Sequence, residues 1–198
     1  LNGEHLLLCS PTGSGKTLTA FLTIIDDLVR RSLDGSLPDA VQCVYISPIK
    51  ALANDIEKNL MGPLGEIKER YLPSRAKEIK VGLRTGDTPQ SEREKMLRKP
   101  PHILITTPES LGLGLASKRF RPILDQMKWF IIDEMHSLVP TKRGTHLSLS
   151  MALMDSVVSS DVQRIGISAT MEPLDAVAEF LVALSLIHIS EPTRQAMI

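Results

Sequence analysis

A glycine-rich loop near the start of the chain has the residue types that hold phosphate. Residues 10–17 read Ser-Pro-Thr-Gly-Ser-Gly-Lys-Thr, after an apolar run and before an amphipathic segment. Glycines let the backbone approach phosphate oxygens, and the N–H groups of a helix N-terminus attract them. Lys16 would reach the β- and γ-phosphates, and Thr17 would offer its hydroxyl to Mg²⁺. The loop predicts a nucleoside triphosphate site made by Thr12, Gly13, Ser14, Gly15, Lys16 and Thr17.

A pair of carboxylates supplies the second half of such a site. Asp133 and Glu134 directly follow the apolar run Trp-Phe-Ile-Ile. Open parallel sheets bind ligands at the carboxyl ends of their strands, so both side chains are expected beside the phosphates. We predict that Asp133 is a metal ligand and that Glu134 orients or deprotonates the attacking water. Alone, the pair could be a solvated turn; beside a phosphate loop it indicates catalysis.

Alternating strands and helices must position these groups. Apolar runs rich in β-branched residues alternate with helical patterns, which predicts a mostly parallel sheet covered on both faces. The segment 62–77 has no clear periodicity and is predicted to be a surface connection. The predicted strands are 5–9, 41–46, 79–84, 102–106, 129–133 and 163–167, and the predicted helices are 18–31, 51–60, 91–98, 108–116, 145–158 and 173–184.

Composition excludes several other classes of protein. The chain has 198 residues, a formal net charge of zero and two cysteines, Cys9 and Cys43. A nucleic-acid partner would therefore be held by local groups rather than by a basic field. The cysteines are too few for a structural zinc site and are expected to be reduced. No apolar stretch reaches the ~18 residues of a membrane span. We expect a cytoplasmic protein with no membrane partner.

Four further motifs follow predicted strands. They are Ser-Pro-Ile-Lys-Ala-Leu at 47–52, Thr-Thr-Pro-Glu-Ser-Leu at 106–111, Asp-Glu-Met-His at 133–136 and Ser-Ala-Thr at 168–170. Together with Arg-Thr-Gly-Asp-Thr at 84–88, this ordered set resembles the first RecA-like domain of superfamily-2 helicases of the Asp-Glu-x-His type. Within these it is most similar to the Lhr (large helicase-related) group, over roughly residues 3–183.

The resemblance implies a three-layer α/β RecA-like domain that uses ATP and Mg²⁺. It also implies an ATP-dependent 3′-to-5′ DNA helicase or translocase whose catalytic residues are Lys16, Asp133, Glu134 and His136. His136 with Ser168, Ala169 and Thr170 would couple the γ-phosphate to movement between two domains. His5, His102, His146 and His188 have no such surroundings and are expected to be structural.

The resemblance further implies a groove for one nucleic-acid strand. Hydroxyls and N–H groups at loop and helix starts can take phosphate oxygens without reading bases. Thr107 could instead be only a helix cap, with Pro108 at the first helical position. Arg84 and Arg143 could be surface charges. The implied groove residues are Pro48, Lys50, Arg84, Gly86, Asp87, Thr107, Pro108, Glu109 and Arg143.

The domain boundaries and partners complete the expectation. Residues 1–183 are predicted to form the ATP-binding domain, and residues 184–198, which read like translated adapter sequence, to be a non-native or disordered tail. Because the chain starts at Leu1, close to the phosphate loop, we expect a fragment of a larger parent. That parent would bind single-stranded DNA, possibly RNA, and supply a second RecA-like domain. Without it, this chain should bind ATP weakly and hydrolyse it poorly.

Two other functions remain open at this point. An RNA helicase or ribonucleoprotein remodeller could carry a similar set of motifs. A nucleotide-gated nucleic-acid-binding module without turnover is a second alternative, although it would not need Glu134. A transporter-type ATPase is excluded by the lack of a Leu-Ser-Gly-Gly-Gln-like signature.

Overall fold

The computed structural model describes residues 4–10, 15–74, 76–169 and 174–182. It contains a six-stranded sheet in the order β1-β6-β5-β2-β4-β3, and every strand pair is parallel. The strands are β1 (Leu6–Cys9), β2 (Cys43–Ile46), β3 (Val81–Arg84), β4 (Ile103–Thr106), β5 (Trp129–Ile132) and β6 (Gln163–Ser168). The prediction of a mostly parallel α/β sheet is confirmed.

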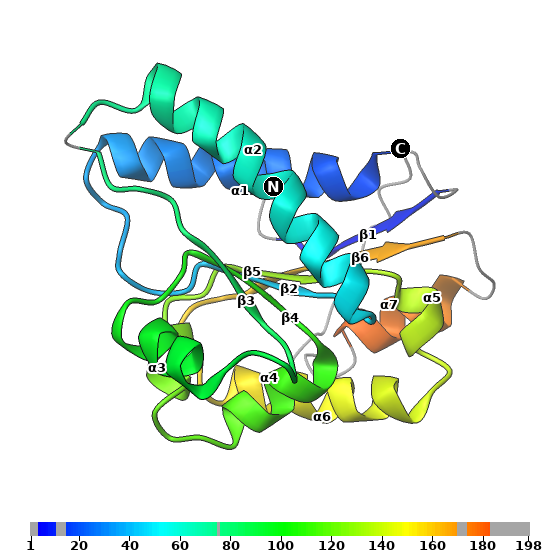
Figure 1. The fold of residues 1–198 in the computed structure, drawn as a ribbon. Coiled ribbons are helices and arrows are strands. Elements are labelled where there is room, and N and C mark those ends of the chain that lie inside the picture. Colours follow the sequence, from blue (N-terminus) through cyan, green and yellow to red (C-terminus); the bar gives the residue numbers. More distant parts are fainter. Residues whose placement is uncertain (1–3, 11–14, 75, 170–173, 183–198) are drawn as a thin grey trace.

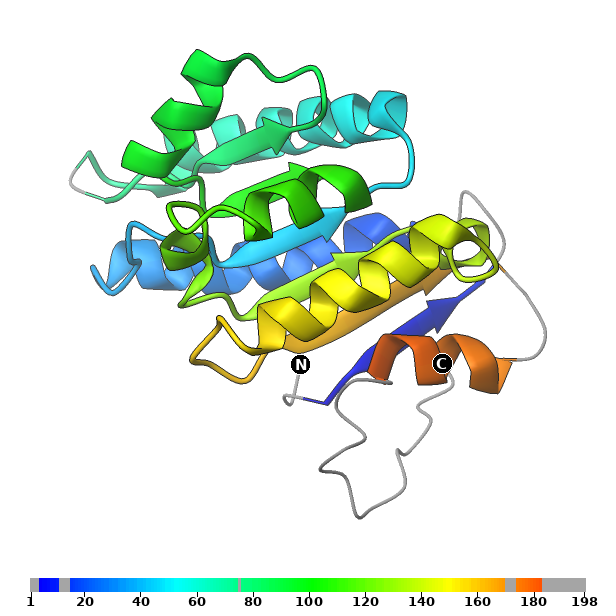
Figure 2. The same cartoon turned by 90° about the horizontal axis from the view of Figure 1, so that it is seen from below.

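Helices cover both faces of this sheet (Figure 1). The helices are α1 (Lys16–Leu33), α2 (Lys50–Tyr71), α3 (Gln90–Arg98), α4 (Pro108–Leu115), α5 (Met135–Leu138), α6 (Lys142–Asp155) and α7 (Leu174–Val182), with a 3₁₀ turn at Arg121–Leu124. One core cluster joins α1 and α2 to the sheet, and the other joins α4 to α7 to the opposite face. Seen from below in Figure 2, α4 and α6 lie side by side along the second face. The result is a three-layer domain.

Residues 62–77 are not a surface connection, and that prediction is wrong for most of the segment. Helix α2 continues through Pro63 to Tyr71. The prediction rested on the lack of clear periodicity, and an interior proline such as Pro63 also disfavours a helix because it removes a backbone hydrogen bond. Leu60 and Leu64, however, are buried at helical spacing and join the core cluster of α1 and α2. This tertiary burial outweighs the weak local propensity.

Helix α6 begins three residues earlier than predicted, because Thr141 caps it. The Thr141 side chain accepts a hydrogen bond from the Gly144 N–H at 3.3 Å. A Cβ on Gly144 would lie 2.3 Å from the carbonyl oxygen of Leu138, so only glycine fits at this approach. Arg143, expected in a loop, therefore lies in the first turn of α6.

Several predictions lie outside the described residues, among them the coupling role of Thr170, the structural role of His188 and the 184–198 tail. Within the described ranges, no helix combines the length and the apolar character that a bilayer crossing requires.

Candidate nucleotide and nucleic-acid site

The phosphate loop leads directly into α1. Gly15 precedes the helix with a φ of 78°, a backbone conformation that glycine adopts at little cost. The Lys16 ammonium donates to the backbone carbonyl of Ser10 and, at 3.2 Å, to its hydroxyl. Lys16 therefore lies over the end of β1, where phosphates would be expected. Thr12, Gly13 and Ser14 lie outside the described residues.

Asp133 lies one residue beyond β5 and is buried, with 4% of its surface exposed. Its Oδ2 accepts a hydrogen bond from the Tyr45 hydroxyl, and its Oδ1 accepts one from the Glu134 N–H at 2.9 Å. Burial raises the pKa of the Asp133 carboxyl, whereas the Tyr45 and Glu134 hydrogen bonds oppose that shift. These two donors favour the ionised form that a metal ligand requires.

Glu134 is held in a strained backbone position by its neighbours. It has a φ of 51°, and among the described residues no other non-glycine residue has a positive φ. Its carboxylate lies 3.2 Å from His136 Nε2, and His136 Nδ1 accepts the Ala169 N–H at 3.2 Å. The second bond assigns the proton of neutral His136 to Nε2, which can then donate to Glu134. A continuous chain of contacts thus links the end of β5 to the end of β6.

A cavity of about 350 Å³ opens between these groups. It is lined by Lys16, Thr17, Asp133 and Glu134, with Phe21 and Ile56 among its apolar neighbours. A second cavity, of about 400 Å³, lies on the other side of Glu134 and His136, against Pro48 and Leu52. The structure therefore brings the predicted phosphate, metal and water-activating groups together; we refer to Lys16, Thr17, Asp133, Glu134 and His136 as the nucleotide side.

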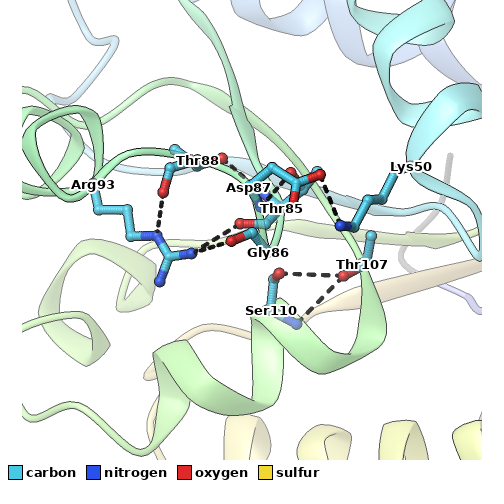
Figure 3. A network of polar contacts seen from close by, with 8 residues as sticks. All are labelled: Lys50, Thr85, Gly86, Asp87, Thr88, Arg93, Thr107 and Ser110. Carbon is cyan, nitrogen blue, oxygen red and sulfur yellow. Dashed lines mark hydrogen bonds and ion pairs between the residues drawn. The ribbon is translucent and has the colours of Figure 1, made fainter.

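The Arg84–Thr88 turn is clamped by a residue that sequence reasoning missed (Figure 3). Arg93 on α3 donates to the carbonyls of Thr88 at 2.8 Å, Thr85 at 3.1 Å and Gly86 at 3.0 Å. The Thr85 N–H also donates to the Thr88 hydroxyl at 2.8 Å. Since these carbonyls are occupied, the turn presents Gly86 and Asp87, both exposed, at the surface. Only the spacing of Arg93, one helical turn after the motif, could have suggested this role.

Two ion pairs connect the predicted groove residues to one another. The Lys50 ammonium lies 2.7 Å from Asp87 Oδ2, which joins α2 to the turn after β3 (Figure 3). Arg143 Nε and Nη2 lie 2.5 and 3.2 Å from the two oxygens of Glu109, which joins α6 to α4. The Arg143 hydrogen bond lowers the pKa of Glu109, and the Glu109 hydrogen bond raises that of Arg143. We call Lys50, Asp87, Glu109 and Arg143 the nucleic-acid side.

Four other predicted groove residues lie deeper in the structure. The Arg84 guanidinium stacks 4.4 Å from the centre of the Phe120 ring, and burial lowers its pKa. It is therefore not an exposed surface charge. Thr107 is buried and accepts the Ser110 N–H at 3.4 Å, so it does cap α4; Pro108 follows it in the first helical position. Pro48 is also buried, at the second cavity. Contact of these residues with nucleic acid stays a prediction.

Two histidines expected to be structural do tie neighbouring strands together. His5 Nδ1 accepts the Arg164 N–H at 3.1 Å, and His102 Nδ1 accepts the Lys80 N–H at 3.0 Å. Burial lowers the pKa of both side chains, that of His102 to about 4. Both imidazoles therefore act as neutral acceptors in the folded protein.

Known proteins resemble this chain along nearly its whole length. ATP-dependent helicase Lhr-Core of Methanothermobacter thermautotrophicus is 54% identical over 184 residues, covering 92% of this chain and 21% of that protein. The Lhr helicase/uracil glycosylase of Escherichia coli is 46% identical over 184 residues, which cover 90% of this chain and 12% of that protein. The solved structure of Mycobacterium smegmatis helicase Lhr bound to ssDNA and AMP-PNP matches with a TM-score of 0.80 and 47% identity, over 90% of this chain and 22% of that chain. This chain therefore spans about a fifth, or less, of the length of these relatives.

These likenesses agree with the resemblance inferred from the motifs. The RecA-like fold is confirmed by the solved Lhr structure, and the Lhr-like character by the relatives. The family described as DEAD/DEAH box helicase matches residues 1–178. The chain belongs to the DEAD/DEAH box helicase family.

Proposed function

We propose that this chain is the ATP-binding domain of an ATP-dependent DNA helicase or translocase, which couples ATP hydrolysis to 3′-to-5′ movement on single-stranded DNA. The observation that carries the proposal is the contact chain from Glu134 through His136 to Ala169. It joins a carboxylate beside the phosphate loop to the end of another strand. A nucleotide-dependent change at Glu134 can therefore reach a second part of the domain.

Each group on the nucleotide side has a chemical role in this proposal. Lys16 neutralises phosphate oxygens, and Glu134 orients the attacking water and accepts its proton. His136 is a positioning residue, because its Nε2–H fixes the Glu134 carboxylate. The left-handed backbone at Glu134 keeps that side chain on the cavity rim, where it lines both cavities.

The residues present fit a Mg²⁺ ion that is shared with the nucleotide. Thr17 offers a hydroxyl and Asp133 a carboxylate oxygen with a free lone pair, and both are hard oxygen ligands. Among the described residues, no group of three or more His, Cys, Asp or Glu could hold a metal alone. That suits an ion whose remaining ligands are phosphate oxygens and water. Bound Mg²⁺ supplies positive charge that neutralises the transferring phosphoryl group.

The remaining parts of the proposal rest on the relatives. The M. smegmatis protein is described with ssDNA and AMP-PNP, which supports ATP and single-stranded DNA as ligands. A second RecA-like domain in the parent would close the nucleotide cleft and supply charge to the transition state. A cytoplasmic location is part of the same proposal.

ATPase measurements on the full-length parent test the proposal. Single-stranded DNA should stimulate hydrolysis, and Lys16→Ala should abolish both hydrolysis and nucleotide binding. Stimulation by RNA but not by DNA would replace the DNA assignment with the RNA alternative. If neither DNA nor RNA stimulated ATP hydrolysis, the proposed helicase function would be wrong. ATP binding without turnover, unchanged by Glu134→Gln, would favour a nucleotide-gated binding module.

A further inference from the structure

Tyr45 is a buried polar residue in the middle of the sheet. It lies in β2 between Ile105 of β4 and Ile131 of β5, with none of its surface exposed. Its ring packs on Phe21 of α1, with 5.2 Å between the ring centres. An apolar side chain would satisfy this packing, so the hydroxyl needs a separate explanation.

The hydroxyl has a specific polar partner at the carboxyl-end rim. It donates to Asp133 Oδ2, while the other carboxylate oxygen takes the Glu134 N–H. Each oxygen of Asp133 thus has one donor and keeps one lone pair. The two donors come from different elements, so together they fix the rotation of the carboxylate.

Thr17, the other proposed metal ligand, lines the same cavity as Asp133. The hydrogen bond from Tyr45 therefore fixes the Asp133 carboxylate at the edge of the cavity that the end of the phosphate loop also reaches. An oxygen lone pair of that carboxylate remains available for the metal.

We propose that Tyr45 is a positioning residue of the metal site, which orients the Asp133 carboxylate for Mg²⁺. This inference rests on the proposed Mg²⁺-dependent binding of ATP. Partners of metal ligands typically change metal affinity by about 10–100-fold when they are removed. Tyr45 acts only through Asp133 and is not itself a ligand.

Tyr45→Phe tests this role, because it keeps the ring and removes only the hydroxyl. The measurement is the Mg²⁺ concentration that half-saturates binding of a fluorescent ATP analogue to the full-length parent. We expect about a tenfold increase in that concentration, with nucleotide affinity in EDTA unchanged. Ile105→Val is the matched control, since it trims a core neighbour of Tyr45 without touching the polar contacts. An unchanged Mg²⁺ requirement in Tyr45→Phe would overturn the inference.

A second measurement does not depend on the variant folding. The chain has two tyrosines, and the other, Tyr71, is exposed at the end of α2. After labelling this chain with 3-fluorotyrosine, AMP-PNP with Mg²⁺ should shift the ¹⁹F signal of Tyr45 more than AMP-PNP in EDTA. The Tyr71 signal should stay in place. Equal Tyr45 shifts with and without Mg²⁺ would also overturn the inference. Absence of any Mg²⁺ effect on wild-type nucleotide binding would instead contradict the proposed function.

Discussion

The nucleotide side and the nucleic-acid side lie on the same rim of the sheet but are built from different interactions. On the nucleotide side, Asp133 is buried and its oxygens take directional hydrogen bonds. On the nucleic-acid side, the Lys50, Asp87, Glu109 and Arg143 side chains are between 43% and 78% exposed and pair with one another. Exposed ion pairs each stabilise a protein by only about 0–1 kcal/mol. One side is therefore preorganised, and the other can exchange its partners readily.

This difference suits the two proposed ligands. A triphosphate needs fixed groups at fixed places, because misplacing catalytic groups is costly. A strand along which the motor moves must be held and released, so weak, exposed contacts are suitable. Asp87 and Glu109 carry the same charge sign as phosphate, and we interpret them as holding Lys50 and Arg143 in place rather than as contacts to the strand.

The largest expected effect comes from breaking the nucleotide side. Glu134→Gln in the full-length parent should lower kcat about 10²–10⁴-fold, because the amide cannot accept the proton from water. ATP affinity should change less than about threefold, since Lys16 and the phosphate loop are intact. Steady-state ATPase rates and equilibrium nucleotide binding measure the two quantities. Glu66→Gln, on the exposed face of α2, is the matched control, and an equal loss in both variants would contradict the assignment.

Acid should weaken the strands that carry the nucleic-acid side. His102 has a folded pKa of about 4, below its ordinary 6.5, so between these values the unfolded chain binds a proton that the folded chain does not. Stability should therefore fall as pH falls, by on the order of 2 kcal/mol between pH 7 and 5. His102→Asn, whose amide oxygen can replace Nδ1, should flatten that slope in urea unfolding. If exposed His146→Gln flattened it equally, His102 would not be the titrating group.

Loosening the Arg84–Thr88 turn should weaken DNA binding on the nucleic-acid side and leave ATP binding on the nucleotide side unchanged. Arg93→Lys leaves a charge but cannot reproduce the three carbonyl contacts of the guanidinium fork. We expect single-stranded DNA affinity to fall about three- to tenfold, because one lost hydrogen bond costs on the order of 1 kcal/mol. Fluorescence anisotropy measures this, and ATP affinity should not change. Arg98→Lys, at the end of α3, should leave DNA binding unaltered.

The smallest effects should come from single members of the ion pairs. Arg143→Ala should lower DNA affinity a few-fold and reduce the salt dependence by about one phosphate contact. Glu109→Gln should have the opposite effect and raise DNA affinity, since it frees Arg143 to contact a phosphate. Titrations at several salt concentrations separate these outcomes, with Arg30→Ala on α1 as the control. Weaker binding in Glu109→Gln would show instead that the strand needs Arg143 held in place by this carboxylate.

The sequence was sufficient to predict the parallel sheet, because the six apolar runs form the six strands and the amphipathic segments between them form helices. It was also sufficient to bring Lys16, Asp133 and Glu134 to one cavity, whereas their catalytic roles stay predictions. Tyr45 and Arg93 were missed, since a tyrosine in a buried strand is normally core and an arginine on a short helix is normally solvated. The role of Tyr45 depends on a hydrogen bond to Asp133, 88 residues away in the sequence, and the role of Arg93 depends on the shape of the turn at residues 84–88. Helix α2 was underestimated because burial of Leu64 outweighs a proline, which local patterns do not report.

The left-handed backbone at Glu134 has a consequence for evolution and engineering. A non-glycine residue with this φ costs about 1 kcal/mol or more. Asparagine and glycine tolerate the conformation better than glutamate does. A population of the parent protein selected for thermal resistance alone should accumulate those two residues at position 134 and lose the proposed ATPase activity. Selection for the proposed movement on DNA should restore glutamate, so the residue at position 134 would report which of the two selections acted.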